Sequence, residues 1–223
     1  MSLVVVGTGT EIGKTITCAL LLSRYAGTSK LTYWKPIATG SSEERDTQVI
    51  ERLCGPEVDI LQELYLFEPP VSPHLAARLA GRRIDPERVL KALETYQQEN
   101  DGRTLIIEGI GGLLVPLTSN GYLLADLLDE MALPCLLVGS STLGTINHTL
   151  LTIEALRSRE LVLVGVVLNG PPHDENRRAI EEFGGVQIVS EIEPLPILSP
   201  ESVLQASRGF DRKALLESHL KRA

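Results

Sequence analysis

A glycine-rich turn near the start of the chain, placed between two apolar segments, constrains the fold more than any other feature. Residues 3–6 are apolar and mostly β-branched, a composition typical of a strand that is buried on both faces. Glycines interrupt this run, and the tripeptide Gly-Lys-Thr at 13–15 then opens an apolar segment with the composition of a helix. Strand, glycine-rich turn, Gly-Lys-Thr and helix in this order predict a phosphate-binding loop, or P-loop.

The residue types of this loop match its predicted chemistry. Glycines allow backbone N–H groups to curve around phosphate oxygens, and the N-terminus of the helix adds partial positive charge. Lys14 would neutralise charge on the β- and γ-phosphates of a nucleotide, and the hydroxyl of Thr15 would bind Mg²⁺. Lys14 and Thr15 are therefore the first candidate site residues.

The spacing of the glycines departs from the common form of the loop, G-x-x-x-x-G-K-[ST]. Its first glycine would fall at Thr8, whereas Gly7 lies one residue earlier, so the loop is one residue longer. A glycine-rich turn that only connects a strand to a helix is the plain alternative. A dinucleotide-binding turn is excluded, because Ile12 stands where it requires glycine and Lys35 stands where it requires an acidic residue.

Composition limits the class of protein. With 223 residues, 43% of them hydrophobic, the chain can bury a full core, and we expect residues 1–223 to form one α/β domain. The net charge of −8 argues against a nucleic-acid partner, which favours a basic surface. The three cysteines form no C-x-x-C pair and predict a reducing compartment rather than disulfides or a zinc site. Because the N-terminus enters a strand directly and the apolar runs are of strand length, we expect a cytoplasmic protein without a membrane partner.

Further apolar runs predict strands at residues 31–35, 104–108, 134–139, 162–169 and 186–189. The longer runs are continuous rather than alternating, which is typical of strands covered by helices on both faces. We expect helices at 46–53, at 75–80, from 85 onward and at about 210–221. We expect loops at 37–45, at 65–74 and around Pro194, Pro196 and Pro200. Together these patterns predict the α/β class, a single-domain, doubly wound and mostly parallel sheet with a P-loop, like that of P-loop NTPases.

Polar residues follow several of these strands, and in a doubly wound sheet ligands bind beyond the carboxyl ends of the strands. Lys35 and Thr39 follow the second strand, Glu108 ends another, and Asn169 with Gly170 ends a later one. We therefore expect these residues to converge with the P-loop on one site.

Three of the polar residues have plain alternatives. Glu108 is either a solvated strand end or a ligand of nucleotide-bound Mg²⁺, since a buried carboxylate needs a positive partner. Asp46 either starts its helix or reaches a metal, and the two roles are compatible. Lys35 either extends to solvent or neutralises a second anionic group beside the loop.

Taken together, the motifs resemble those of the dethiobiotin synthetase family, which acts in biotin synthesis. The resemblance extends from residue 3 to about residue 170 and fades afterwards. It is carried by residues 7–15 (GTGTEIGKT), 35–40 (KPIATG), 72–74 (SPH), 108–112 (EGIGG) and 144–152 (GTINHTLLT). The longer P-loop is that family's own form.

The resemblance implies an ATP- and Mg²⁺-dependent ring closure. CO₂ would react with one amine of 7,8-diaminopelargonic acid to give a carbamate, and ATP would phosphorylate this carbamate. The neighbouring amine would then attack the mixed anhydride, closing the ureido ring of dethiobiotin and releasing ADP and phosphate. It also implies a homodimer, in which the helix start at 143–147 binds the distal carboxylate of substrate held mainly by the other subunit.

The resemblance implies roles for individual residues. Lys14 and Lys35 would be catalytic, and Thr15, Asp46 and Glu108 would hold Mg²⁺. The expected ATP-binding residues are Glu11, Ile12, Gly13, Lys14, Thr15, Ile16, Asp46, Glu108, Gly109, Ile110, Gly111, Asn169, Gly170, Pro194, Leu195 and Pro196. The expected substrate-binding residues are Thr10, Thr39, Ser72, Pro73, Leu143, Gly144 and Asn147.

Two other functions are compatible with a P-loop. One is a nucleotide switch or regulatory domain without ligase activity, although such a protein has no evident need for Lys35, Thr39 and the segment 72–74. The other is an ATP-dependent ligase that amidates a larger carboxylate such as a corrin ring. We expect 223 residues to be too few to include the glutaminase domain of that enzyme, which weakens this option.

Overall fold

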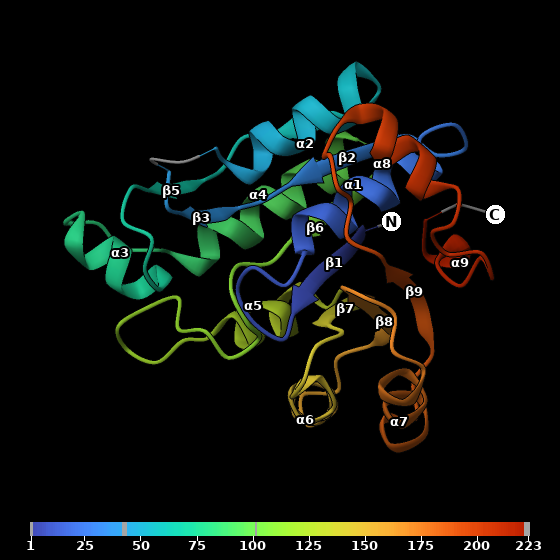
Figure 1. The fold of residues 1–223 in the computed structure, drawn as a ribbon. Helices are drawn as coiled ribbons and strands as arrows, with labels where there is room; N and C mark the ends of the chain where they lie inside the picture. The colour runs from blue at the N-terminus through green and yellow to red at the C-terminus, as the bar shows by residue number, and fades with distance from the viewer. Residues whose placement is uncertain (1, 42–43, 101, 221–223) are drawn as a thin grey trace.

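The computed structural model of the chain describes residues 2–41, 44–100 and 102–220. Its centre is a seven-stranded sheet in which every pairing is parallel (Figure 1). In spatial order the strands are β4 (Asp59–Leu61), β2 (Leu31–Trp34), β6 (Thr104–Glu108), β1 (Ser2–Gly7), β7 (Cys135–Ser140), β8 (Leu163–Asn169) and β9 (Ile188–Ile192). The chain extends the sheet from β1 first toward β4 and later toward β9. This confirms the predicted doubly wound parallel sheet.

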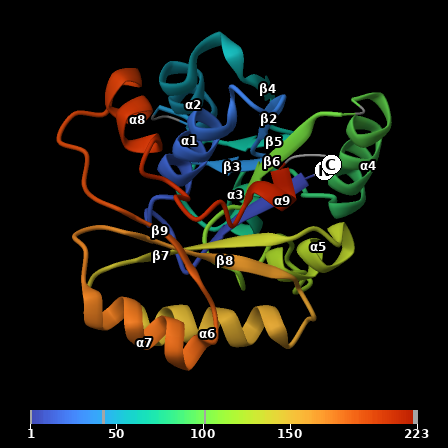
Figure 2. The ribbon, with the colours of Figure 1, turned by 90° about the vertical axis from the view of Figure 1, so that its right-hand side faces the viewer.

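Helices cover both faces of this sheet. Figure 2 shows α1 (Lys14–Tyr25), α2 (Asp46–Cys54) and α8 (Pro200–Ser207) on one side of the strands, and α6 (Thr145–Arg157) and α7 (Asp174–Gly184) on the opposite side. The remaining helices are α3 (Pro73–Leu79), α4 (Pro86–Glu99), α5 (Leu124–Met131), the short α9 (Glu217–Leu220) and the 3₁₀ turn Gly55–Glu57. Among the described residues, no helix combines the length and the apolar character needed to cross a membrane.

The core consists of two layers, one on each face of the sheet. Along β1, Val4 and Val6 pack in one layer with residues of α4 to α7, while Leu3 and Val5 pack in the other with residues of α1, α2 and α8. Each side of the strand therefore buries apolar side chains, which explains why the sequence shows a continuous apolar run rather than an alternating one.

The structure corrects several predicted loops. Residues Ile37–Thr39 form β3 and Tyr65–Phe67 form β5, and the two strands pair in parallel as a separate small sheet. Strand β4 was not predicted either. Each of these three strands is only three residues long, which is too short for a periodic pattern in the sequence. Each also pairs with a strand that lies far from it in the sequence, so its formation depends on tertiary contacts. Residues 42–43 of the predicted 37–45 loop lie outside the described residues.

The C-terminal prediction was wrong in part. Strand β9 begins and ends later than the predicted 186–189, and Pro200, expected in a loop, is the first residue of α8. Of the helix predicted at 210–221, only α9 forms, because Asp211 and Ala214 adopt positive φ angles of 47° and 54° that a helix does not permit. Residue 221 lies outside the described residues. The helices predicted at 46–53 and from 85 onward are confirmed as α2 and α4, and the one at 75–80 as α3, which starts two residues earlier.

Asp211 connects this C-terminal segment to the first helix. Its side chain is fully buried and accepts three hydrogen bonds, from the Tyr25 hydroxyl at 2.5 Å and from the backbone N–H groups of Leu215 at 2.8 Å and Leu216 at 2.9 Å. Burial and the neighbouring Asp211 carboxylate raise the pKa of Tyr25, so the phenol remains protonated and donates. The Asp211 carboxylate therefore accepts backbone hydrogen bonds that carbonyl groups would accept if the segment were a continuous helix.

We expect Asp211→Ala to lower the free energy of unfolding by about 3 kcal/mol, because three donors, two of them buried and one partly buried, lose their acceptor at about 1 kcal/mol each. Urea denaturation followed by circular dichroism would measure the change. The matched control Tyr25→Phe removes one of the three bonds and should cost about 1 kcal/mol. Equal losses in the two variants would show that the backbone contacts of Asp211 contribute nothing.

Candidate active site

The P-loop connects β1 to α1 at the carboxyl edge of the sheet, and close packing requires glycine at two of its positions, Gly7 and Gly13. A side chain at Gly7 would place its Cβ 2.7 Å from a methyl carbon of Ile12, and one at Gly13 would lie 2.2 Å from the Asn169 side-chain nitrogen. Gly13 also has a φ of 94°, which disfavours other residues. The Asn169 amide donates a hydrogen bond to the Ile12 carbonyl at 3.1 Å, so the end of β8 supports the loop directly.

Lys14 lies inside the loop. Its ammonium group donates to the carbonyls of Gly9 at 2.7 Å and Gly111 at 2.9 Å, which joins the P-loop to the glycine-rich segment after β6. Burial lowers the pKa of Lys14 to about 8, against the opposing effect of the Glu108 carboxylate. Within the described part of the chain, the Lys14 ammonium donates only to backbone carbonyls, so an anion placed beside it would stabilise its charge.

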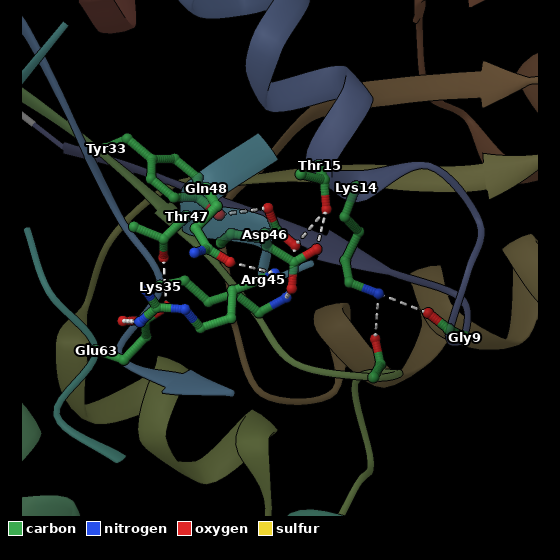
Figure 3. Close-up of polar contacts among 12 residues, drawn as sticks. Gly9, Lys14, Thr15, Tyr33, Lys35, Arg45, Asp46, Thr47, Gln48 and Glu63 are labelled. Atoms are coloured by element: carbon green, nitrogen blue, oxygen red, sulfur yellow. Dashed lines mark hydrogen bonds and ion pairs between the residues drawn. The ribbon is translucent and has the colours of Figure 1, made fainter. Parts of the chain in front are cut away.

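The second charged cluster lies beside Thr15. The Thr15 hydroxyl is 2.6 Å from Asp46 Oδ1 and 3.0 Å from Glu108 Oε1. The Lys35 ammonium donates to Asp46 Oδ2 and, at 2.8 Å, to Glu108 Oε1. In Figure 3, Asp46 lies between Thr15 and Lys35, whereas Lys14 extends toward Gly9. Residues from α1, β6, α2 and the end of β2 thus meet at one point.

The burial of this cluster decides between the alternatives left by the sequence. Glu108 is 1% exposed and Lys35 is 6% exposed, so neither is a solvated strand end. Asp46 is the first residue of α2, as one of its two expected roles requires, and it also contacts Thr15 and Lys35. Its expected contact with a metal stays a prediction. The convergence expected for the P-loop, Lys35, Glu108 and Asn169 is therefore present, and Asp46 joins it.

The pKa values of the two lysines at the site shift in opposite directions, down for Lys14 and up for Lys35. Burial alone would lower the pKa of Lys35, but the charges of Glu108 and Asp46 outweigh it and hold this pKa above its usual range. Burial would likewise raise the pKa of Asp46, and the charge and hydrogen bonds of Lys35 and Thr15 bring it below its usual value. Lys35 and the carboxylates accordingly stabilise each other in their charged forms.

The donor set of this cluster fits Mg²⁺. Thr15, Asp46 and Glu108 offer a hydroxyl and two carboxylates, which are hard oxygen ligands. The described residues contain no group of three or more His, Cys, Asp or Glu side chains arranged to hold a metal. Mg²⁺ commonly binds through one or two carboxylates together with phosphate oxygens and water, so two carboxylates are sufficient.

The remaining predicted ATP-binding residues surround the P-loop. Glu11 lies at the exposed tip of the loop with a φ of 58°, and Ile16 is in the first turn of α1. Gly109 approaches β1 closely, because its N–H donates to the Val5 carbonyl at 2.9 Å, and Ile110 is buried beside it. Gly170, at the end of β8, donates its N–H to the Ile192 carbonyl, and a side chain there would collide with the Ser141 hydroxyl.

The segment Pro194 to Pro196 lies farther along the same edge, immediately after β9. Leu195 and Pro196 line a groove of about 880 Å³ that β9 and the residues after α8 also border. No described contact joins this segment to the charged cluster around Lys35 and Asp46, so its predicted role at the nucleotide base stays a prediction.

The predicted substrate-binding residues fall into two groups. In the first group, Thr10 is exposed in the P-loop, and Thr39 ends β3, which packs against α3, where Ser72 and Pro73 begin the helix. The Ser72 hydroxyl is 3.1 Å from His74 Nδ1, which fixes this turn. The second group, at the start of α6, consists of Leu143, Gly144 and Asn147. All three are exposed, and they lie beyond β7, on the far side of β1 from Lys35.

The sequence analysis missed two contributors to the site. The Tyr33 hydroxyl donates to Glu108 Oε2 at 2.8 Å, and its position two residues before Lys35 on one strand was a usable signal. Glu63 holds the start of α2 in place, accepting from Thr47 at 2.6 Å and pairing with Arg45 at 3.4 Å (Figure 3). Glu63 lies in a loop, and no local sequence pattern connects it to α2.

Comparison with solved structures identifies the fold. A ParA family ATPase from Chlorobium tepidum superposes with a TM-score of 0.61 over 97% of this chain and 96% of its own, at 12% identity. The cell division ATPase MinD from Pyrococcus furiosus superposes with a TM-score of 0.56 over 93% of this chain and 97% of its own, at 14% identity. At such low identity these similarities establish a P-loop ATPase fold and nothing about function.

Comparison of sequences identifies the family. A family model described as an AAA domain matches residues 1–202. The ATP-dependent dethiobiotin synthetase BioD of Agrobacterium fabrum is 43% identical over 96% of this chain and 96% of its own length. The protein of the same name from Paramagnetospirillum magneticum is 41% identical over 89% of this chain and 91% of its own. Since both relatives are similar to this chain along nearly their whole length, the chain belongs to the ATP-dependent dethiobiotin synthetase family.

Proposed function

We propose that this enzyme uses ATP and Mg²⁺ to close the ureido ring of dethiobiotin from 7,8-diaminopelargonic acid and CO₂ or bicarbonate. The observation that supports it most is the meeting of Lys35 with Asp46 and Glu108 beside the P-loop threonine. A second buried cation next to a phosphate-binding loop suits a reaction in which two anionic molecules must approach each other. A nucleotide switch would need the loop and the carboxylates, but it has no use for this lysine.

The proposed reaction conserves atoms at each step. One amine of the substrate adds to CO₂, giving a carbamate and releasing a proton. A carbamate oxygen then takes the γ-phosphoryl group of ATP, and ADP leaves. The second amine attacks the carbamoyl carbon, the C–O bond to phosphate breaks, and phosphate and a proton are released as the ring closes. Because both amines belong to one molecule, proximity contributes strongly to the last step.

The residues of the site have distinct proposed roles in this reaction. Thr15, Asp46 and Glu108 would hold Mg²⁺, which when bound neutralises phosphate charge and orients the β- and γ-phosphates. Lys14 would bind the oxygens of the transferred phosphoryl group from the P-loop side. Lys35 would contact the carbamate and stabilise the charge that develops on the oxygens between the two reactants.

The binding surfaces around the cluster complete the proposal. Thr10, Thr39, Ser72 and Pro73 would contact the diamine, and Asn169, Gly170 and the segment from Pro194 to Pro196 would lie along the nucleotide base. The start of α6, with Leu143, Gly144 and Asn147, would bind the distal carboxylate of substrate held by the partner subunit of a homodimer. Leu143 and Leu151 are 103% and 56% exposed, and burial of such leucines in a dimer would be favourable.

We also propose that residues 1–223 act as one ligase domain in the cytoplasm. The free thiols of Cys18, Cys54 and Cys135 suit a reducing compartment. The acidic net charge of −8 suits small-molecule substrates rather than nucleic acid.

Phosphate release measured with ATP, Mg²⁺ and bicarbonate, with and without 7,8-diaminopelargonic acid, tests this function. We expect release to depend on the diamine and to match the dethiobiotin formed, detected by mass spectrometry, in a one-to-one ratio. A mono-amine analogue of the substrate is the matched control, because it can form a carbamate but cannot close the ring. Phosphate release that is indifferent to the diamine would instead favour a nucleotide switch.

Lys35→Met should reduce kcat by on the order of 10²–10³-fold, because the variant loses a buried cation directed at developing negative charge. The affinity for the nucleotide should survive, since Lys35 contacts carboxylates and Lys14 remains in the loop. Steady-state kinetics and calorimetry with an ATP analogue would measure the two quantities. Lys91→Met, a change to an exposed lysine of α4, controls for loss of charge. Near-normal turnover in Lys35→Met would contradict a catalytic role.

The affinity for metal-free ATP should fall as the pH rises through the Lys14 pKa of about 8. The protonated lysine binds phosphate, and each pH unit above its pKa leaves about tenfold fewer protonated lysines. Full affinity is therefore expected near neutral pH, with a loss of about tenfold one unit above the pKa. Calorimetry across this range would measure the change. Lys14→Met should bind ATP weakly and without this pH dependence, and the same dependence in both proteins would exclude Lys14 as its source.

A further inference from the structure

Strand β2 and Lys35, the residue that follows it, together bind both oxygens of the Glu108 carboxylate. Alternate residues of a strand point to the same face, so Tyr33 and Lys35 lie on one face, and Trp34 lies on the other. The Lys35 ammonium donates to Glu108 Oε1 at 2.8 Å, and the Tyr33 hydroxyl donates to Oε2 at 2.8 Å. Trp34 belongs to the opposite core layer, where its indole N–H donates to the Gln62 carbonyl. Glu108 stands on the neighbouring strand β6, and the pairing of the two strands sets this contact.

The phenol and the carboxylate are sealed from solvent together. Tyr33 is 0% exposed and Glu108 is 1% exposed, so bulk water does not reach Oε2 to replace the phenol. Burial raises the pKa of Tyr33, and the negative charge of Glu108 raises it further. The phenol thus remains protonated and donates. The buried thiol of Cys18 lies on the same side, and its pKa is raised by burial first and by Glu108 second.

We propose that Tyr33 is a positioning residue for the metal-binding role of Glu108. The terminal torsion of a glutamate side chain is broad, so an isolated carboxylate turns easily. With Oε2 held by Tyr33, Oε1 is the oxygen that faces Thr15 and Lys35, where the metal is proposed to bind. The inference rests on the proposed function only for the metal site, and it makes no use of the diamine or of CO₂.

The hydroxyl, rather than the ring, is the informative part of this side chain. A phenylalanine would fill almost the same volume in the core layer shared with Leu31, Ile106 and Cys18. The hydroxyl adds one charge-assisted hydrogen bond to a buried carboxylate, a bond stronger than that between two neutral groups. Partners of this kind, one step behind a metal ligand, typically change metal affinity by about 10–100-fold.

The test is Tyr33→Phe, with Mg²⁺ titrated by calorimetry into the complex of the enzyme with a non-hydrolysable ATP analogue. We expect the Kd for Mg²⁺ to rise by about 10–100-fold, while binding of the analogue in EDTA changes by less than about twofold. The matched control is Tyr96→Phe. It removes another buried phenol that donates to a residue of β2, Thr32, at 2.6 Å, but away from Glu108. This control should keep the metal affinity of the unmodified enzyme.

Three results would overturn the proposal. They are a rise in the Mg²⁺ Kd of less than about tenfold, an equal loss of metal-free nucleotide binding, and an equal rise in the Tyr96→Phe control. The metal affinity is measured without diamine. The outcome of this test is therefore independent of the diamine-dependent phosphate release that tests the ligase function.

A double variant keeps the test decisive if Tyr33→Phe alone leaves too costly a buried charge to fold. Glu108→Gln neutralises that charge and itself weakens Mg²⁺ binding. In this background, Tyr33→Phe should change the Mg²⁺ Kd by less than about twofold, because the phenol acts through the carboxylate. A further rise of tenfold or more would show that Tyr33 acts by another route and would reject the positioning role.

Discussion

The ion pairs of Lys35 with Asp46 and Glu108 are the interactions on which the site depends. The carboxylates of Asp46 and Glu108 lie close together and are partly and fully shielded from solvent, respectively. Without the cation that both of them contact, they would repel each other, and the protonated form of one would be favoured. Removing one partner of such a buried group leaves an uncompensated charge, which costs far more than the pair contributes. The cluster therefore requires β2, β6 and α2 to keep their relative positions. The fold sets the register of the two strands through the parallel pairing of β2 with β6.

The position of β1 in the middle of the sheet explains why distant segments reach one site. The P-loop follows β1, Lys35 follows β2 two positions away, Glu108 ends β6 between them, and Asn169 ends β8 on the other side. All of these strands are parallel, so their carboxyl ends share one edge. ATPases of the ParA and MinD type have the same fold at 12–14% identity. A shared scaffold therefore does not select a reaction, and in the proposed function the side chains at this edge would do so.

The sequence predicted those parts of the structure that leave a local pattern. Continuous apolar runs revealed the long central strands, and polar residues at their ends revealed Lys35, Glu108 and Asn169. Strands β3, β4 and β5 escaped, since three residues are too few to show a period. The helix expected at 210–221 failed because a buried carboxylate, Asp211, satisfies the backbone that a helix would have satisfied, and its tyrosine partner lies in α1. Glu63 and the orientation of Glu108 depend on contacts between distant segments, which only the folded chain displays.

The opposite environments of the two lysines suggest how the site separates its tasks. Lys35 has carboxylates as partners within the protein, so its charge is fixed whatever is bound. Lys14 has backbone carbonyls as direct partners and a pKa of about 8, so its charge is only partly stabilised by the protein. An anion within a few ångströms favours the charged form of a lysine. A polyphosphate therefore gains more from Lys14 than from Lys35, whose charge is already shared with Asp46 and Glu108. In the proposed reaction, Lys14 would therefore contribute chiefly to binding the nucleotide, and Lys35 would contribute to the charge balance that lets a second anion approach it.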